Sequence, residues 1–425
     1  MCEFKQYKCC SVLLLITVLA LMVMPAEAYM PNNDRDADSS WALFLERLHY
    51  DAKALIQASY YSEPSSSQWA QNPAVYLPRY NALLSLRPNL YYHHEKLTLS
   101  LKPRFDAQYQ ENENIDGDHN GADDNRIYVN EWLARFMLTQ KLFISYGREN
   151  LQWGGAYLFS PSNPFFTDNG RRNPKKEVEG MDFARLVLIP NMTWTLSFIV
   201  HTDEGEQELR EPFETAYAIK LDYNAAQYYA SAIGTYREDF GSRIGLYGGW
   251  TCSDALLIYA EGAIGEQRAM IFPLRADDFS NSNALEDQFE SDRWTGSILA
   301  GAAYTLTSGP TLTAEFLYSG MGETLDELNA VLLPSKRSAD YTFFENKNYL
   351  LVQYTHNDIA EVWDLVLRAT YGLDDASGAL TAIAEYDLSD HLILYAIGTL
   401  NFGPEDTEYG QQLDHHVTVG IEYSY

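Results

Sequence analysis

From about residue 80 to its end, the chain alternates apolar and polar residues with a period of two. Between Leu97 and Tyr109, every second side chain is Leu, Pro, Phe, Ala or Tyr, and the intervening ones are Thr, Ser, Lys, Arg, Asp or Gln. Segments 193–201 and 363–371 repeat this pattern. A period of two is that of a β-strand with unlike faces. The segments run to about 10 to 13 residues, against about 5 to 6 in soluble sheets, which suits strands that cross a bilayer.

The alternation predicts eighteen strands, an even number, with sixteen as the alternative. Their expected ranges are 49–61, 81–91, 94–109, 125–139, 141–152, 180–189, 192–201, 213–223, 226–237, 241–252, 254–265, 292–307, 310–319, 341–356, 360–372, 378–388, 391–402 and 412–425. After the first strand the connections run long, short, long, short to the end, and those at 238–240 and 373–377 are only weakly long. Short periplasmic turns and longer external loops are typical of outer-membrane barrels. The predicted fold class is therefore all-β, a transmembrane antiparallel up-and-down β-barrel.

The first strand is the most ambiguous element. Residues 39–61 also fit a helix, because Ser40 could cap it and several apolar residues from Trp41 to Ile56 share one helical face. Tyr50, Ala52, Ala54, Ile56, Ala58 and Tyr60 nevertheless alternate without a break. The interpretation adopted is a strand over 49–61, with a short helix over 39–48 as a periplasmic extension or a plug.

The first 28 residues have the layout of a secretory signal. Lys5 and Lys8 precede an apolar run from Val12 to Met24, and Ala26-Glu27-Ala28 follows. The expected organisation is thus a cleaved signal peptide over 1–28, an N-terminal periplasmic extension or short helix over 29–48, and a transmembrane barrel over 49–425. Cleavage would leave Cys252 as the only cysteine and exclude an intrachain disulfide.

The formal net charge of −29 argues against nucleic acid as a partner. The last strand adds a different signal, because its apolar positions alternate up to an aromatic final residue. Tyr423 and Tyr425 resemble the C-terminal signature by which outer-membrane barrels are recognised for assembly. This resemblance implies the barrel assembly machinery as a partner.

Two neighbouring segments, Gly147–Gly154 and Ser160–Phe165, resemble a pattern of little-characterised Gram-negative porin-like families and, more loosely, of polysaccharide-export barrels. The matching residues are Arg148, Trp153, Gly154, Pro161, Asn163 and Pro164. The resemblance covers about residues 80–200 and the last strand. It implies a multi-pass barrel in the cell outer membrane, in contact with outer-membrane lipids and lipopolysaccharide. It identifies no substrate.

Segment 153–179 is long, rich in Pro and Gly, and carries a basic cluster of Arg171, Arg172, Lys175 and Lys176. One interpretation is a loop folded into the lumen that narrows the pore and attracts anions. The alternatives are a solvated outer loop or one that binds the phosphates of lipopolysaccharide.

If the apolar faces meet lipid, both signs of charge line the lumen. The expected lumen residues are Lys102, Arg104, Asp106, Glu131, Arg135, Lys220, Asp222, Glu315, Asp364, Arg368, Glu385 and Glu422. Ion-pair ladders that stiffen the wall are the alternative interpretation of most of them. Together with the basic cluster, Arg104, Glu131, Arg135 and Arg368 are the candidate pore or constriction residues.

No metal, cofactor or catalytic site is predicted. The run from Asp116 to Gly121 imitates the start of a calcium loop, but its twelfth position is Ile127 instead of a bidentate Glu. The chain has no G-x-S-x-G, H-E-x-x-H or C-x-x-C motif. Ser197 and His201 share a face, yet four residues along a strand span roughly 13 Å. A channel for passive diffusion of small solutes is the predicted function. An outer-membrane enzyme acting on lipids and a closed structural or adhesive barrel are the alternatives.

Overall fold

The computed structural model describes residues 46–62, 77–114, 116–166, 169–207, 213–238, 241–267, 293–320, 346–404, 407–410 and 414–425. The expected signal peptide over 1–28 and all of the expected extension before residue 46 lie outside this part of the chain. No helix within the described ranges is both long and apolar enough to cross a membrane.

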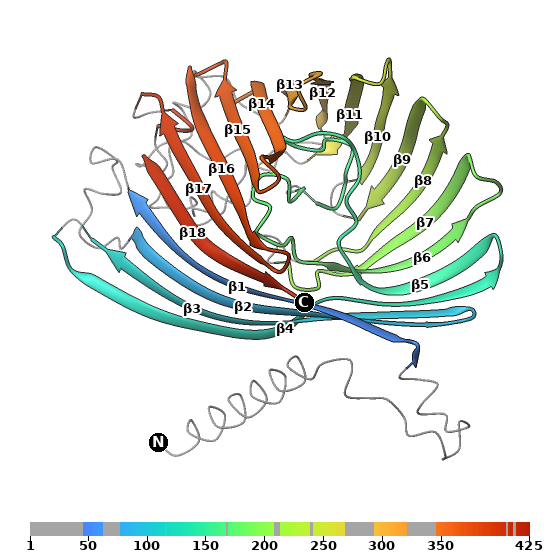
Figure 1. Cartoon of the computed structure of the whole chain (residues 1–425). Coiled ribbons are helices and arrows are strands. Elements are labelled where there is room, and N and C mark those ends of the chain that lie inside the picture. The colour runs from blue at the N-terminus through green and yellow to red at the C-terminus, as the bar shows by residue number, and fades with distance from the viewer. Residues whose placement is uncertain are drawn as a thin grey trace, which may run out of the picture.

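Eighteen strands form one closed sheet, in which each strand pairs with its sequence neighbours and the last pairs with the first (Figure 1). They are β1 (Leu48–Ser62), β2 (Leu77–His94), β3 (Leu97–Glu113), β4 (His119–Thr139), β5 (Leu142–Glu149), β6 (Met181–Leu188), β7 (Trp194–Asp203), β8 (Ala216–Asn224), β9 (Tyr228–Arg237), β10 (Gly241–Thr251), β11 (Leu256–Gln267), β12 (Arg293–Thr305), β13 (Thr311–Ser319), β14 (Asn348–Ile359), β15 (Trp363–Gly372), β16 (Ser377–Ser389), β17 (Leu392–Phe402) and β18 (His415–Ser424). All the pairings that their registers define are antiparallel. The predicted eighteen-stranded barrel is therefore confirmed, and the alternative of sixteen strands is wrong.

β1 settles the ambiguity of the first element. Its residues pair with β2 on one side and with β18 on the other, and Ala58 lies opposite both Ala82 and Val419. Without this strand the cylinder would stay open between β18 and β2, with two unpaired edges. Leu48 already belongs to β1, and residues 39–45 of the expected helix lie outside the described residues.

Short and long connections alternate along most of the chain, but the connection between β9 and β10 is no longer than the one between β8 and β9, and the connection expected over 110–124 is wrong in its extent. β3 continues to Glu113 and β4 begins at His119, so that only a tight turn joins them. In this turn the Asn114 amide donates to the Asp118 carbonyl, and Gly117 has a φ of 76°. Both faces of the paired ends are polar, so period two disappears from the sequence while the backbone ladder continues.

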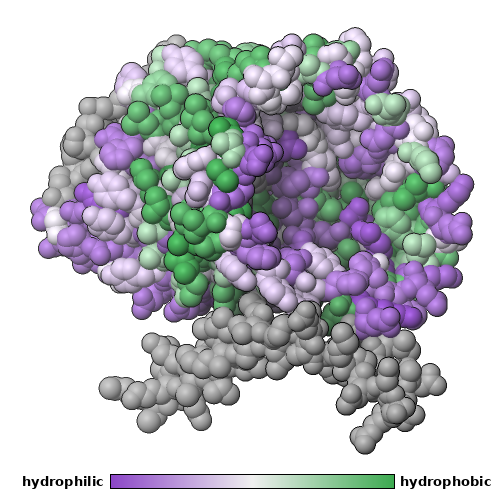
Figure 2. Space-filling model, viewed as in Figure 1, coloured by the Kyte–Doolittle hydropathy of each residue, from purple (hydrophilic) through white to green (hydrophobic). Residues whose placement is uncertain are grey.

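The exposure of side chains is the reverse of that in a soluble protein. Large apolar residues such as Ile56 and Ile244 point outward, with 59% and 52% of their surface exposed. Charged residues such as Arg104 and Glu315 point inward and are 2% and 1% exposed. Figure 2 shows hydrophobic residues on the outer surface of the β16–β18 wall and a central hollow lined mainly by hydrophilic ones. The assigned faces thus match an apolar solvent outside and a polar interior.

Aromatic side chains collect at the strand ends that meet the short connections. Trp194 packs on Tyr223 with ring centroids 4.8 Å apart, and Trp363 packs on Tyr386 at 4.7 Å. Amphipathic rings favour the level of the lipid headgroups. These pairs therefore form one of the two aromatic girdles that bound the apolar band.

Candidate channel constriction

The connection between β5 and β6, residues 150–180, runs inside the curve of the strands (Figure 1). We call it the inner loop. Its described residues form hydrogen bonds or ion pairs with side chains of β2, β3, β11, β13, β15, β16 and β18. In a ring of eighteen strands, β3 stands nine places from β12, which is the opposite side. The loop is bound to β3 on one side of the ring and to β11 and β13, the neighbours of β12, on the other. It therefore crosses the lumen.

Glu261 of β11 is the first anchor. Its buried carboxylate accepts hydrogen bonds from the amides of Gly155 and Ala156 at 2.7 and 3.0 Å, and from the hydroxyls of Ser160 and Ser162 at 2.6 and 3.0 Å. Four donors satisfy the hydrogen-bonding capacity of a buried carboxylate. The inner loop is thus folded around one wall side chain.

The backbone at Gly154 explains why the segment Gly147–Gly154, which resembles porin-like families, ends in a glycine. Its φ is +88°, and a Cβ there would lie 2.2 Å from an oxygen of Glu261. Only glycine meets both the left-handed backbone and the close approach of the carboxylate. Asn163 closes the same turn, because its amide nitrogen donates to the Leu151 carbonyl and its oxygen accepts from the Phe165 amide.

Glu315 of β13 is the second anchor on this side of the barrel. Its oxygens accept from the amides of Tyr157 and Leu158 at 2.7 and 3.0 Å, and from the hydroxyl of Tyr259. Around the two anchors, Ala156, Leu158 and Phe159 of the loop pack against buried wall residues; these are Tyr259, Leu299, Leu317, Tyr349 and Leu351. Apolar burial therefore adds to the hydrogen bonds that fix this half of the loop.

Arg104 of β3 binds the other half. Its Nε and Nη2 donate to the two oxygens of Glu177 at 2.6 and 2.9 Å, and a third nitrogen donates to the Pro88 carbonyl. Arg87 of β2 donates to the Lys175 carbonyl at 3.1 Å. Burial by itself raises the pKa of Glu177, but the hydrogen bond and charge of Arg104, with a contribution from Arg87, outweigh it and hold the pKa below its ordinary value.

The basic cluster divides into two kinds of environment. Lys175 is buried, and its Nζ lies 3.0 Å from Glu385 of β16 and 3.3 Å from Glu422 of β18, so carboxylates compensate its charge. Arg171 instead donates to the carbonyls of residues 154–156, and its side chain is exposed. Lys175 thus binds the loop to the wall, whereas Arg171 is an exposed residue that bonds within the loop.

Arg368 of β15 joins the same region. Its guanidinium donates to the carbonyls of Arg171 and Arg172 at 3.0 and 3.2 Å and to the side-chain oxygen of Gln353 at 2.7 Å. Arg172 donates to the Leu158 carbonyl at 2.8 Å. The acceptors named here are carbonyl and amide oxygens, so these bonds fix the positions of the guanidinium groups.

Other candidates lie apart from the constriction. Glu131 pairs with Lys102 within the wall at 3.0 Å, as the ladder interpretation expects. Arg135 stacks over Phe143, with its guanidinium carbon 4.9 Å from the ring centroid. Lys176 is exposed on the inner loop. Asp116 lies at the turn between β3 and β4, and no group of three or more His, Cys, Asp or Glu in the described residues could hold a metal ion.

The sequence interpretation missed three residues that hold the loop, Glu261, Glu177 and Arg87. A signal existed for the first, because Glu261 lies in mid-strand on the face opposite Ile258 and Ile264. None existed for Glu177, whose partner Arg104 stands 73 positions earlier. Ser197 and His201 both point inward and are buried, and His201 packs against Phe183 at 5.0 Å.

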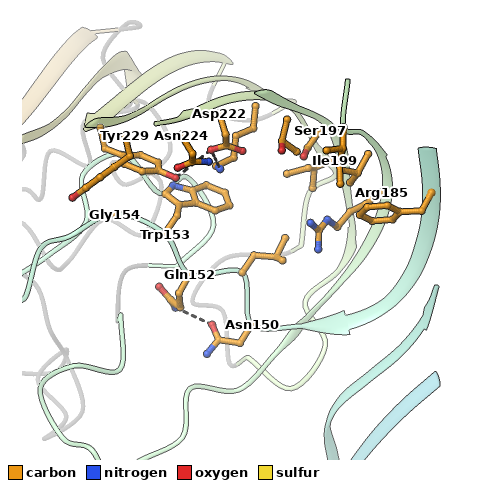
Figure 3. Close-up of a pocket in the computed structure, with 17 residues that line it drawn as sticks. Asn150, Gln152, Trp153, Gly154, Arg185, Ser197, Ile199, Asp222, Asn224 and Tyr229 are labelled. Atoms are coloured by element: carbon orange, nitrogen blue, oxygen red, sulfur yellow. Dashed lines mark hydrogen bonds and ion pairs between the residues drawn. The ribbon is translucent and has the colours of Figure 1, made fainter. Parts of the chain in front are cut away.

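A cavity of about 570 Å³ lies between the start of the inner loop and the wall from β5 to β10 (Figure 3). Gln152 and Trp153 border it on the loop side, and Arg185 and Ser197 on the wall side. Several of its wall residues stand at strand ends beside the short connections, among them Phe143, Thr195 and Tyr229. The cavity therefore occupies the half of the lumen nearest those connections.

No protein-family model and no curated protein matches the chain, but solved structures do. The outer membrane protein OprD of Pseudomonas aeruginosa matches with a TM-score of 0.54 and 11% identity, over 88% of this chain and 94% of OprD. OccK11 of the same organism gives 0.57 and 12%, over 90% and 96%. OccAB3 of Acinetobacter baumannii gives 0.51 and 12%, over 88% and 99%. The chain therefore has the fold of these barrels.

Proposed function

We propose that this protein is a channel of the Gram-negative outer membrane, through which small solutes diffuse passively past the inner loop. The observation that carries the proposal is the bound path of that loop across the lumen, from Glu261 of β11 to Arg104 of β3. The loop is a long connection that is held at both sides of a hydrophilic lumen. Such a loop narrows the pore, whereas a separate plug domain would close it.

The location follows from the same physics. The closed barrel satisfies its strand backbones internally, presents apolar side chains outward, and shares its fold with an outer membrane protein. Its expected neighbours are outer-membrane lipids and lipopolysaccharide, and the barrel assembly machinery during its insertion. Passive transport requires no cofactor and no catalytic residue. We assign none, and the channel remains preferred over the alternative of a lipid-cleaving enzyme.

We further propose that the constriction favours anions. Arg171 donates to carbonyls of the loop, and Arg368 donates to the Arg171 carbonyl and the Gln353 amide oxygen, so both place positive charge beside the inner loop although the whole chain carries a formal charge of −29. In a narrow pore with low-dielectric walls, a few oriented charges govern ion preference more than the net charge does.

Reconstitution in planar lipid bilayers tests the proposal. We expect stepwise single-channel currents from the purified, detergent-folded protein, which should also migrate differently on a denaturing gel before and after boiling. A protein that shows the gel shift but passes no current would be a closed structural or adhesive barrel. Hydrolysis of phospholipid or lipid A by the pure protein would favour the enzyme.

A further inference from the structure

The cavity beside the inner loop has the size and composition of a small-molecule site. Its volume of about 570 Å³ falls within the roughly 300–1,000 Å³ of ordinary ligand pockets. Aromatic, amide and hydroxyl side chains converge on it from the loop and from strands β5 to β10 (Figure 3). A solute that passes the constriction on this side of the loop would meet these groups next.

The charged residues of the cavity are paired with one another or with near neighbours. Arg185 donates to both oxygens of Glu149 at 3.0 and 3.1 Å. Lys220 pairs with Asp222, which also accepts from the hydroxyls of Ser231 and Tyr247. An ionic solute would have to break such pairs and leave a half-buried charge behind. A neutral solute would not.

The remaining lining offers two further kinds of contact. Trp153, Tyr229 and Tyr247 supply aromatic surface, while Thr195 and Asn224 supply a hydroxyl and an amide. The indole N–H of Trp153 is buried and has no hydrogen-bond acceptor among the described residues. A buried donor without an acceptor costs free energy that a ligand oxygen would recover.

From this lining we propose that the cavity is a binding site for a neutral sugar on the solute path, an inference that rests on the proposed channel function. Sugar rings have one face rich in C–H groups, which packs on the electron-rich face of an aromatic ring. Their hydroxyls both donate and accept hydrogen bonds, as amides and hydroxyls of the wall require. An aromatic solute without hydroxyls would leave those wall groups unpaired.

Current block by maltose in single-channel recordings of the full-length protein tests the site. We expect the block to saturate with concentration, because a site can be occupied only once. A polyethylene glycol of matched hydrodynamic radius should reduce the current in proportion to its concentration. Glucuronate and glucosamine, which carry opposite charges, should block more weakly than maltose. Equal, non-saturating effects of maltose and polyethylene glycol would overturn the inference while leaving the channel intact.

Three variants separate the contacts. Trp153→Ala should raise the half-saturating maltose concentration about tenfold, whereas Trp153→Phe, which keeps a ring and removes the N–H, should raise it roughly threefold. Tyr229→Phe removes one hydroxyl of the cavity without changing its packing and should weaken the block by a similar factor. Tyr128→Phe removes a lumen hydroxyl that donates to Asp106 outside the cavity lining and should change nothing.

Equilibrium dialysis of labelled maltose against the detergent-folded protein keeps the two proposals distinguishable. If the protein passes no current but binds maltose, and Trp153→Ala abolishes the binding, the channel proposal fails and the sugar site stands. If it conducts but binds no maltose, the site is refuted and the channel stands. Binding that survives both Trp153→Ala and Tyr229→Phe would place the sugar elsewhere and would also refute this site.

Discussion

Arg104 and Glu177 form a two-bond ion pair between the wall and the inner loop, with N–O distances of 2.6 and 2.9 Å. The arginine is almost completely buried, and its pair is the tie between the loop and β3. Two parallel bonds fix the orientation of the carboxylate as well as its distance. Glu261 and Glu315 hold the loop on the opposite side, so this pair is one of the contacts, with those of Arg87 and Lys175, that bind the crossing segment at its second side.

The variant Glu177→Gln should loosen the constriction. The amide can still accept one bond but cannot compensate the charge of Arg104, so we expect the free energy of unfolding to fall by about 1–3 kcal/mol. Single-channel recordings should show a larger mean conductance and more current noise than in the native protein. Glu214→Gln removes an exposed carboxylate from the β7–β8 connection and serves as the control. If both variants conduct alike, the pair does not restrict the pore.

Acid should release the same tie. The pKa of Glu177 is held below its ordinary value of 4.5, so its stabilising contribution is complete above pH 4.5 and is lost as the pH falls through the lower folded-state pKa. We expect the conductance of the native channel to stay constant from pH 7 to 5 and to rise towards that of Glu177→Gln below pH 4.5. Recording both proteins across this range checks it, since a constant difference between them down to pH 3 would contradict the assignment.

The fold followed from the sequence further than the constriction did. Alternation over long strands predicts the lipid face because a misplaced charge there is costly, and that periodicity is local in sequence. The inner loop depends instead on contacts such as Lys175 with Glu422, which are 247 positions apart. A run of basic residues has the same composition whether it contacts solvent, lipopolysaccharide or buried carboxylates. Its sequence therefore does not show which of these environments it has.

Ion preference should respond to Arg171 and Arg172. A unit charge 7 Å from the path contributes about 0.6 kcal/mol in water, with opposite sign for an anion and a cation, so it changes the ratio of anion to cation permeability roughly sevenfold before salt screening. We expect the double variant Arg171→Gln/Arg172→Gln to lower this ratio, measured as the reversal potential in a KCl gradient. The change should shrink as the salt concentration rises. Lys96→Gln/Lys141→Gln, in the exposed β2–β3 and β4–β5 turns, is the charge-matched control. An unaltered reversal potential would remove these arginines from the selectivity of the pore.

The outer face can be tested with one arginine. Leu367 of β15 points outward and is 45% exposed, whereas Thr399 of β17 points inward and bonds to Thr381. Leu367→Arg should lower the free energy of unfolding in lipid vesicles by about 2–4 kcal/mol, because the charge would stand near the bilayer midplane. Thr399→Arg should cost far less, since its side chain reaches a wet lumen. Urea titrations of both variants in vesicles provide the comparison, and equal costs would mean that the faces are assigned wrongly.

Tyr425 has two separable roles at the seam where the barrel closes. Its ring stacks on Tyr50 with centroids 5.9 Å apart, and its backbone exchanges hydrogen bonds with Ala52. The backbone bonds survive Tyr425→Ala, so we expect the purified barrel to lose the aromatic pair and the bond that the Tyr50 hydroxyl donates to the Tyr425 hydroxyl, together about 0.5–1.5 kcal/mol. If the terminal ring is also the recognition signal for assembly, the amount of folded protein in the outer membrane of cells should fall severalfold more than this loss explains. Comparing in vitro unfolding with the heat-modifiable fraction in cells separates the roles, because proportional losses would leave the ring a seam contact alone.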